Sequence, residues 1–136
     1  MYIDDLDLRK LKEEYINFLF EFRSLELSTI NEKGYPQSSY APFVSDSQNN
    51  FFIYVSSLAN HYKNLINYKK AGVMFIESEE KSENIFARRR LIFDCVVENV
   101  IKNTKEWKKI MKKFEENFGQ IIKTLIKLPD FDLFEL

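Results

Sequence analysis

Strict alternation of side chains in residues 85–100 constrains the fold more than any other feature of this chain. The segment reads IFARRRLIFDCVVENV, and a period of two residues predicts a long β-strand. Its more apolar face carries Leu91, Phe93, Cys95 and Val97 together with Arg89. We expect this face to join the core. Arg88 and Arg90 would then share the opposite, outer face with Ile92, Asp94 and Val96.

Shorter extended segments and three amphipathic helices fill the rest of the chain. Strand patterns cover residues 24–30, 35–44, 51–56, 73–76 and 131–136. Helical spacing covers an N-terminal segment within residues 1–22, a short segment at 58–68 that Ser56 or Ser57 would cap, and a long one at 104–128. Strands grouped in this way predict a single α+β domain over residues 1–136, an antiparallel barrel of about six strands with flanking helices.

Composition excludes several classes of protein. The 20 Lys and Arg residues nearly balance the 21 Asp and Glu residues, which argues against a general nucleic-acid binder. The chain has neither an apolar run of about 18 residues nor an apolar signal core, so we expect a cytoplasmic protein without a membrane span. A lone cysteine, Cys95, excludes an internal disulfide framework. The 13 Phe residues and the prolines in edge-like strands predict apolar surface for a homodimer.

Residues 56–64, SSLANHYKN, contain the richest group of candidate site residues. A strand is predicted to end here and a helix to begin, and such junctions gather free N–H groups and a positive dipole end. Ser56, His61 and Lys63 could therefore bind a phosphate or carboxylate. The alternative is a capped surface helix with a solvated Lys63. His61 is also a candidate metal or haem ligand, against the alternative of a surface histidine.

The second candidate group is the run Arg88-Arg89-Arg90. Three arginines inside an otherwise apolar strand cost desolvation free energy unless they meet anions. Guanidinium geometry suits propionate, phosphate or carboxylate groups. The alternative is ion pairing with the acidic loop at residues 77–83, ESEEKSE.

These segments together resemble the haem-utilisation branch of the pyridoxamine-phosphate-oxidase-like, FMN-binding split barrels. The resemblance rests on SYAPF, the Ser-x-x-Ala-x-His segment, IFARRRLIFD and LPDFDLFEL, in this order. It implies a Greek-key type split β-barrel that forms a homodimer, with cofactor sites at the dimer interface. In the wider superfamily the FMN phosphate binds at the strand-to-helix junction, where this chain has Asn60, His61 and Lys63.

In the haem branch, the resemblance implies that the same cleft binds haem and that Arg88 to Arg90 contact haem or its ligand. Members of that branch degrade haem with oxygen and an electron donor and so release iron. Some use a histidine beyond the matched region as the iron ligand, and within residues 1–136 His61 or a partner subunit would supply it. Haem degradation is our first expectation for this chain. The alternatives are an FMN-dependent oxidoreductase and a non-catalytic cofactor-binding module.

Overall fold

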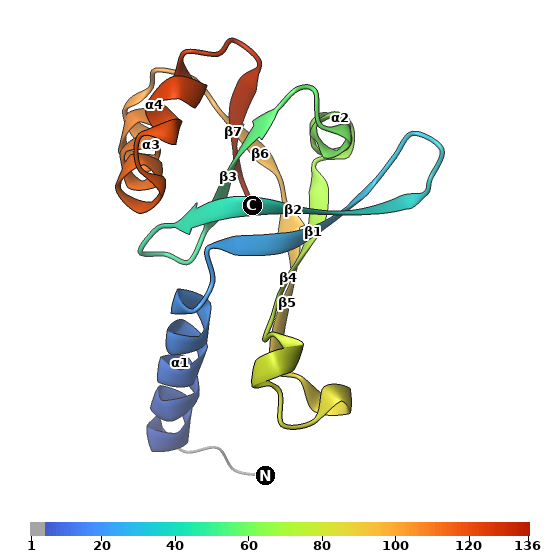
Figure 1. Cartoon of the computed structure of the whole chain (residues 1–136), viewed down its shortest axis with the longest axis vertical. Coiled ribbons are helices and arrows are strands. Elements are labelled where there is room, and N and C mark those ends of the chain that lie inside the picture. Colours follow the sequence, from blue (N-terminus) through green and yellow to red (C-terminus); the bar gives the residue numbers. More distant parts are fainter. Residues whose placement is uncertain (1–4) are drawn as a thin grey trace.

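The computed structural model describes residues 5–136 and shows one strongly curled antiparallel sheet with helices around it (Figure 1). The first four residues of the predicted N-terminal helix lie outside the described part. The helices are α1 (Asp5–Phe20), α2 (Asn60–Tyr68), α3 (Lys105–Phe118) and α4 (Ile121–Ile126). The strands are β1 (Ser24–Ile30), β2 (Pro36–Ser45), β3 (Phe51–Ser56), β4 (Lys70–Ile76), β5 (Arg90–Val96), β6 (Glu98–Val100) and β7 (Phe131–Glu135). The order across the sheet is β5-β4-β1-β2-β3-β7-β6, so the α+β prediction is confirmed.

The prediction of one continuous strand over residues 85–100 is wrong. Residues 85–87 form a 3-10 turn, and the extended part divides into β5 and β6 at Val97. β5 pairs with β4 at one edge of the sheet, whereas β6 pairs with β7 at the other edge. Val97 is buried and donates its N–H to the Lys69 carbonyl, 2.9 Å away, as the chain crosses between the edges. This division raises the number of strands from the expected six to seven.

Two hydrophobic cores lie on opposite sides of the sheet. On the concave, inner side, α1 and α2 cover an aromatic core in which Phe75 contacts the rings of Phe22, Phe43, Phe51 and Phe93. On the outer side, α3 and α4 cover the β3–β7–β6 half through a second core. That core contains Val44, Phe52, Val100, Trp107, Ile110, Met111, Phe114, Ile122 and Leu133.

The predicted long helix at residues 104–128 is interrupted. Thr104 caps α3 as expected, since its hydroxyl accepts the Trp107 N–H at 3.3 Å. Gly119 then adopts φ 81° and ψ −150°, a backbone conformation that residues other than glycine rarely adopt. The break turns α4 away from α3, and both helices then pack on the same half of the sheet (Figure 1).

The outer side of the other half, formed by β5, β4, β1 and β2, is bare. Cross-strand register places Tyr40, Glu26, Met74 and Ile92 in one row on this side. Tyr40 is 69% exposed and Ile92 is 65% exposed, although both carry large apolar groups. The predicted faces of residues 90–96 are therefore confirmed, with Leu91, Phe93 and Cys95 directed inward. No helix within residues 5–136 is both long and apolar enough to cross a membrane.

Candidate functional site

The strand-to-helix junction after β3 is held by β7 rather than left open for an anion. The Ser56 hydroxyl donates to the Asp130 carboxylate at 2.9 Å, and the Ser57 N–H donates to the Asp130 carbonyl at 2.6 Å. The Ser56 hydroxyl also accepts the Leu58 N–H at 3.2 Å. The prediction that Ser56 or Ser57 caps α2 is wrong, because this turn delays the helix and leaves Ala59 at the N-cap without a side-chain bond.

The first turn of α2 presents the three residues that matched the phosphate site of the superfamily. Asn60 and Lys63 are exposed, and His61 is half-buried. Burial lowers the pKa of the His61 imidazole below its usual value, so the ring is neutral near pH 7. A neutral imidazole can ligate a metal or accept a hydrogen bond. Residues 5–136 contain no group of three or more His, Cys, Asp or Glu side chains that could hold a metal ion.

Two aspartates that the sequence patterns did not single out belong to this junction, Asp130 just before β7 and Asp132 within it. Asp130 binds Ser56, and Asp132 accepts a short hydrogen bond from the Tyr62 hydroxyl. That bond, with burial and the Asp132 charge, raises the pKa of Tyr62 to about 12. The alternation in Asp130-Phe131-Asp132 after Pro129 was the available signal, since a period of two puts both carboxylates on one face.

The buried side of α2 carries a further polar link. Asn64 is 4% exposed, and its side-chain amide donates to the Thr29 hydroxyl at 3.0 Å and to the Gln37 side-chain oxygen at 2.7 Å. These bonds fix α2 against β1 and β2. The position of His61 is therefore determined by a helix anchored on two sides, to β7 through Tyr62 and to the first hairpin through Asn64.

The arginine run is organised by Glu77, which the sequence analysis treated as part of a solvated loop. Glu77 is only 6% exposed, and its carboxylate accepts the Arg89 Nε at 2.8 Å and the Arg89 backbone N–H at 2.9 Å. These two bonds lower the pKa of Glu77 below its usual value. The Arg88 Nε donates to the Glu77 carbonyl at 3.0 Å. The ion-pair alternative thus holds for Arg89, and Arg88 is tied to the backbone of the same residue.

Arg90 differs from its two neighbours because it begins β5, is exposed, and shares the face of Ile92 by alternation. Its Nη1 donates to the Arg88 carbonyl at 3.0 Å, and the residue also borders a hollow of about 700 Å³ between β5 and α1. The expectation that Arg88 and Arg90 act as a pair on one strand face is wrong. Residue 88 precedes β5, and its side chain turns back to Glu77.

Within one chain, the junction and the arginines are far apart. α2 ends where β4 begins at Lys70, whereas Arg90 pairs with Ile76 at the other end of β4. A strand of this length spans about 20 Å at about 3.3 Å per residue. The structure therefore does not bring Ser56, His61 and Lys63 together with Arg90.

A hollow of about 270 Å³ lies on the bare outer side, close to Arg90 in register. Its walls include Met74 and Ile92, and its floor is formed by small residues of neighbouring strands, Ser28, Ser38 and Gly72. A Cβ atom at Gly72 would lie 2.5 Å from the Ser28 hydroxyl oxygen, so a side chain at this position would displace that hydroxyl. The hollow is apolar at one side and polar on its floor.

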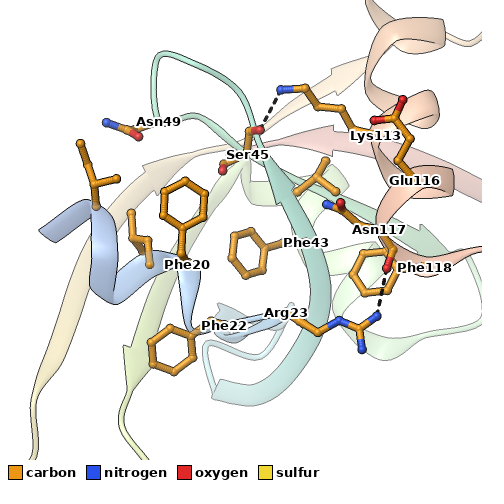
Figure 2. Close-up of a pocket in the computed structure, with 13 residues that line it drawn as sticks. Phe20, Phe22, Arg23, Phe43, Ser45, Asn49, Lys113, Glu116, Asn117 and Phe118 are labelled. Carbon is orange, nitrogen blue, oxygen red and sulfur yellow. Dashed lines mark hydrogen bonds between the residues drawn. The ribbon is translucent and has the colours of Figure 1, made fainter. Parts of the chain in front are cut away.

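A larger cavity, about 470 Å³, separates the end of α1 from α3 (Figure 2). Phe20, Phe22 and Phe43 form its apolar side. Opposite them, Arg23 donates to the Asn117 carbonyl at 3.0 Å, and Lys113 donates to the Ser45 carbonyl at 3.1 Å. None of the site residues expected from the sequence lines this cavity, and both cations already bind backbone carbonyls.

Known proteins match nearly the whole chain. The family model for pyridoxamine 5'-phosphate oxidase matches residues 11–136. The haem oxygenase HutZ of Vibrio cholerae is 38% identical over 127 residues, which cover 93% of this chain and 72% of HutZ. A crystal structure of HutZ, there named a haem storage protein, superposes with a TM-score of 0.87 at 37% identity over 93% of this chain and 88% of that one. Campylobacter jejuni ChuZ superposes with a TM-score of 0.82 at 31% identity, over 93% of this chain and 52% of ChuZ.

Proposed function

The chain belongs to the pyridoxamine 5'-phosphate oxidase family of split barrels, in its haem-utilisation branch, and from this premise we propose that it binds haem and degrades it. The observation that carries the proposal for this chain is the bare outer side of β5, β4, β1 and β2. It combines exposed apolar side chains with the exposed Arg90 at one end. A porphyrin requires this combination, because its ring is flat and apolar and its edge carries two propionates.

Apart from the Glu26 carboxylate, which lines the hollow on this side, the residues of the bare side fit such a group. Met74 and Ile92 would contact the ring, and Arg90 at the end of the same side would pair with a propionate. A hollow of about 270 Å³ is too small to enclose a porphyrin. We therefore place haem between this surface and a second copy of the chain, in a homodimer.

A homodimer also explains why the candidate residues lie near opposite ends of β4 within one protomer. Antiparallel stacking of two bare sides would bring the Lys70 end of β4, where α2 joins the sheet, toward Arg90 of the partner subunit. His61, neutral near pH 7, lies on α2 on the inner side of the sheet, so it would reach the haem only from the edge of this interface, as a ligand or hydrogen-bond acceptor. The burial of exposed apolar groups such as Tyr40 and Ile92 would stabilise the pair.

FMN, the alternative cofactor, fits the junction less well. Its phosphate would need the Ser56 hydroxyl, which already donates to Asp130. The carboxylates of Asp130 and Asp132 lie beside the start of α2, where they repel a phosphate dianion. Lys63, in the first turn of α2, carries the opposite charge. These charges favour haem over FMN at the interface.

Degradation of haem draws on the iron, which activates oxygen when electrons are supplied. The protein's own residues bind the ring, orient its propionate edge through Arg90, and exclude water from the interface. His61 would accept a proton at the edge of the interface, since burial keeps the imidazole neutral. The Tyr62–Asp132 and Ser56–Asp130 bonds keep the helix that carries His61 fixed on β7.

The test is a haem titration followed by reduction in air. We expect a Soret band at one haem per protomer or per dimer, and then loss of that band with release of iron when ascorbate is added. Arg90→Ala should weaken haem binding by about 10- to 150-fold, the worth of a charge-assisted hydrogen bond. Arg9→Ala, which removes an exposed arginine from α1, is the matched control and should bind normally.

Three other outcomes contradict parts of the proposal. Flavin bands in the purified protein without haem binding would establish the FMN alternative. A stable Soret band that ascorbate does not bleach would show a binding or storage protein. Unchanged haem affinity in Arg90→Ala would remove Arg90 from the site.

A further inference from the structure

The solvent side of α3 carries four lysines, Lys105, Lys108, Lys109 and Lys112, which we call the lysine stripe. All four are exposed, and spacings of three and four residues place them on one helix face about 10 Å long. The opposite face of α3 is buried through Trp107, Ile110, Met111 and Phe114. The next lysine, Lys113, points back to the Ser45 carbonyl and is not part of the stripe (Figure 2).

Positive charge is concentrated at the stripe in a chain that is slightly acidic as a whole. Residues 102–113 contain six lysines and one glutamate, whereas the net charge of the chain is −1. Within residues 5–136, no ion pair reaches a lysine of the stripe. The four ammonium groups are therefore available to a partner.

The placement of these lysines works against the stability of α3. Lys105 and Lys108 lie in the first turns, where the helix dipole favours acidic side chains. Like charges at i, i+3 and i, i+4 repel each other in an isolated helix. Glu106, Glu115 and Glu116 have the spacing to offset this repulsion, but none of them forms an ion pair with the stripe. A feature that opposes local stability without a structural partner indicates a role in binding.

We propose that the lysine stripe docks an acidic one-electron carrier protein that reduces bound haem. This inference rests on the proposed haem degradation, which consumes electrons from outside the chain. In the step concerned, the reduced iron–sulfur or flavin centre of the carrier loses one electron, and ferric haem iron gains it and becomes ferrous. The helix α3 and the bare half lie on the same outer side of the sheet, so a carrier on α3 would sit beside the proposed haem surface.

The chemistry of the stripe favours a transient protein partner over other anions. It contains no arginine, the residue that holds phosphates in bidentate geometry, and no exposed aromatic ring on which bases could stack. A membrane-surface helix needs a free apolar face, and that of α3 is buried. Hydrated lysines act at long range and raise association rates more than affinity, as short-lived electron-transfer complexes require.

The test uses the full chain loaded with haem and a double charge reversal, Lys105→Glu with Lys108→Glu. The new glutamates lie four residues before Lys109 and Lys112, so they pair with the remaining half of the stripe and bring its charge to zero. The control, Lys33→Glu with Lys81→Glu, changes the net charge equally at two exposed positions elsewhere. Haem loss is driven either by an acidic plant-type ferredoxin with its NADPH-dependent reductase or by ascorbate.

We expect the stripe variant to lose about 10-fold or more of the ferredoxin-driven rate at low salt, and the control to lose little. Added salt should slow the unsubstituted protein toward the rate of the variant. Ascorbate-driven haem loss should be equal in all three proteins. The melting temperature of the stripe variant should rise by a few degrees, because unfavourable charges have been removed.

Two results would overturn the docking proposal while leaving haem degradation intact. In one, ascorbate bleaches the haem of all three proteins, and the ferredoxin-driven rate is the same in all three and does not depend on salt. The other is stripe-dependent binding to anionic vesicles or to RNA with no effect on ferredoxin-driven turnover. Failure of ascorbate to bleach haem in the unsubstituted protein would instead contradict the proposed function itself.

Discussion

The two halves of the sheet have the same alternating strands, but their outer sides differ. In the β3–β7–β6 half, outward side chains such as Phe52 and Leu133 are 1% and 0% exposed because α3 and α4 cover them. In the β5–β4–β1–β2 half, Ile92 is 65% exposed and Tyr40 is 69% exposed. Both halves share the inner aromatic core. The covered half therefore stabilises the monomer, and the bare half is available for a partner and a ligand.

This difference explains why the site proposed here is incomplete within one chain. The face covered by α3 and α4 needs no further partner to bury its apolar side chains. The bare face combines Met74 and Ile92 with Arg90 at its end, and no other element of the described residues lies over it. Large apolar groups left exposed on a sheet mark an interaction surface.

The largest expected effect separates the two halves directly. Phe52→Ala should lower the free energy of unfolding by about 3–5 kcal/mol, because it leaves a cavity under α3. Ile92→Ala, its counterpart on the bare half, should change the stability of the monomer by no more than about 0.5 kcal/mol. Urea denaturation monitored by circular dichroism gives both values.

Protein concentration sharpens this test. The loss in Phe52→Ala should be the same at every concentration, whereas any loss in Ile92→Ala should grow with concentration as the dimer becomes important. Equal losses for the two variants in dilute solution would show that the bare half is not bare in the monomer.

Much of the sheet follows from the sequence alone. The predicted bounds of β1 and β3 coincide with the observed ones, because each is a short alternating or apolar run between polar turns. The division of the predicted long strand into β5 and β6 at Val97 could not be predicted from the sequence. Alternation continues through this residue, and only closure of the barrel decides that β5 and β6 pair with opposite edges.

The site was harder to predict than the fold. His61 and Arg90 became candidates because their residue types are informative wherever they occur, and they stay predictions. Glu77 was missed because it stands in an acidic run that is typical of a solvated loop, and its burial depends on Arg89 twelve positions later. The role of Asp130 depends on contact with Ser56, 74 residues away, which no local pattern encodes.

The second prediction concerns the partner of the bare half. Ile92→Arg places a charge at the centre of the proposed interface and should weaken dimerisation by about 2 kcal/mol or more, about 30-fold. Sedimentation velocity at micromolar concentration should show a dimer for the unsubstituted chain and a monomer for the variant. A monomer in both cases would contradict the proposed homodimer and with it the placement of haem between two subunits.

The third prediction tests the break at Gly119 that allows both α3 and α4 to pack on the covered half. Gly119→Ala forces a Cβ into the backbone conformation that separates α3 from α4, and should cost about 1–3 kcal/mol of stability. No atom lies within 4 Å of the new Cβ, so the cost reflects backbone conformation and not a clash. Gln120→Ala, next to it in helical conformation, is the control and should be nearly neutral. A neutral Gly119→Ala would mean that α3 and α4 can join as one helix without loss.

The smallest expected effect lies in α2, which connects the covered half to the bare half. The Tyr62 hydroxyl donates to Asp132, and this bond together with burial raises the pKa of Tyr62 to about 12. An unfolded tyrosine loses its proton near pH 10. Below that pH both states are neutral and the bond contributes fully to stability. As the pH rises from about 10 to about 12, the unfolded state releases its proton first, so the contribution is lost.

Tyr62→Phe removes the bond and with it this pH dependence. We expect the unsubstituted protein to melt at a higher temperature than Tyr62→Phe at pH 8, and the difference to be clearly smaller at pH 11. Tyr68→Phe, which removes an exposed hydroxyl at the other end of α2, is the control and should show no such trend. A difference that stays constant from pH 8 to pH 11 would show that Asp132 does not hold the proton of Tyr62. The anchor that links α2 to the covered half would then be the packing of the Tyr62 ring on Phe134.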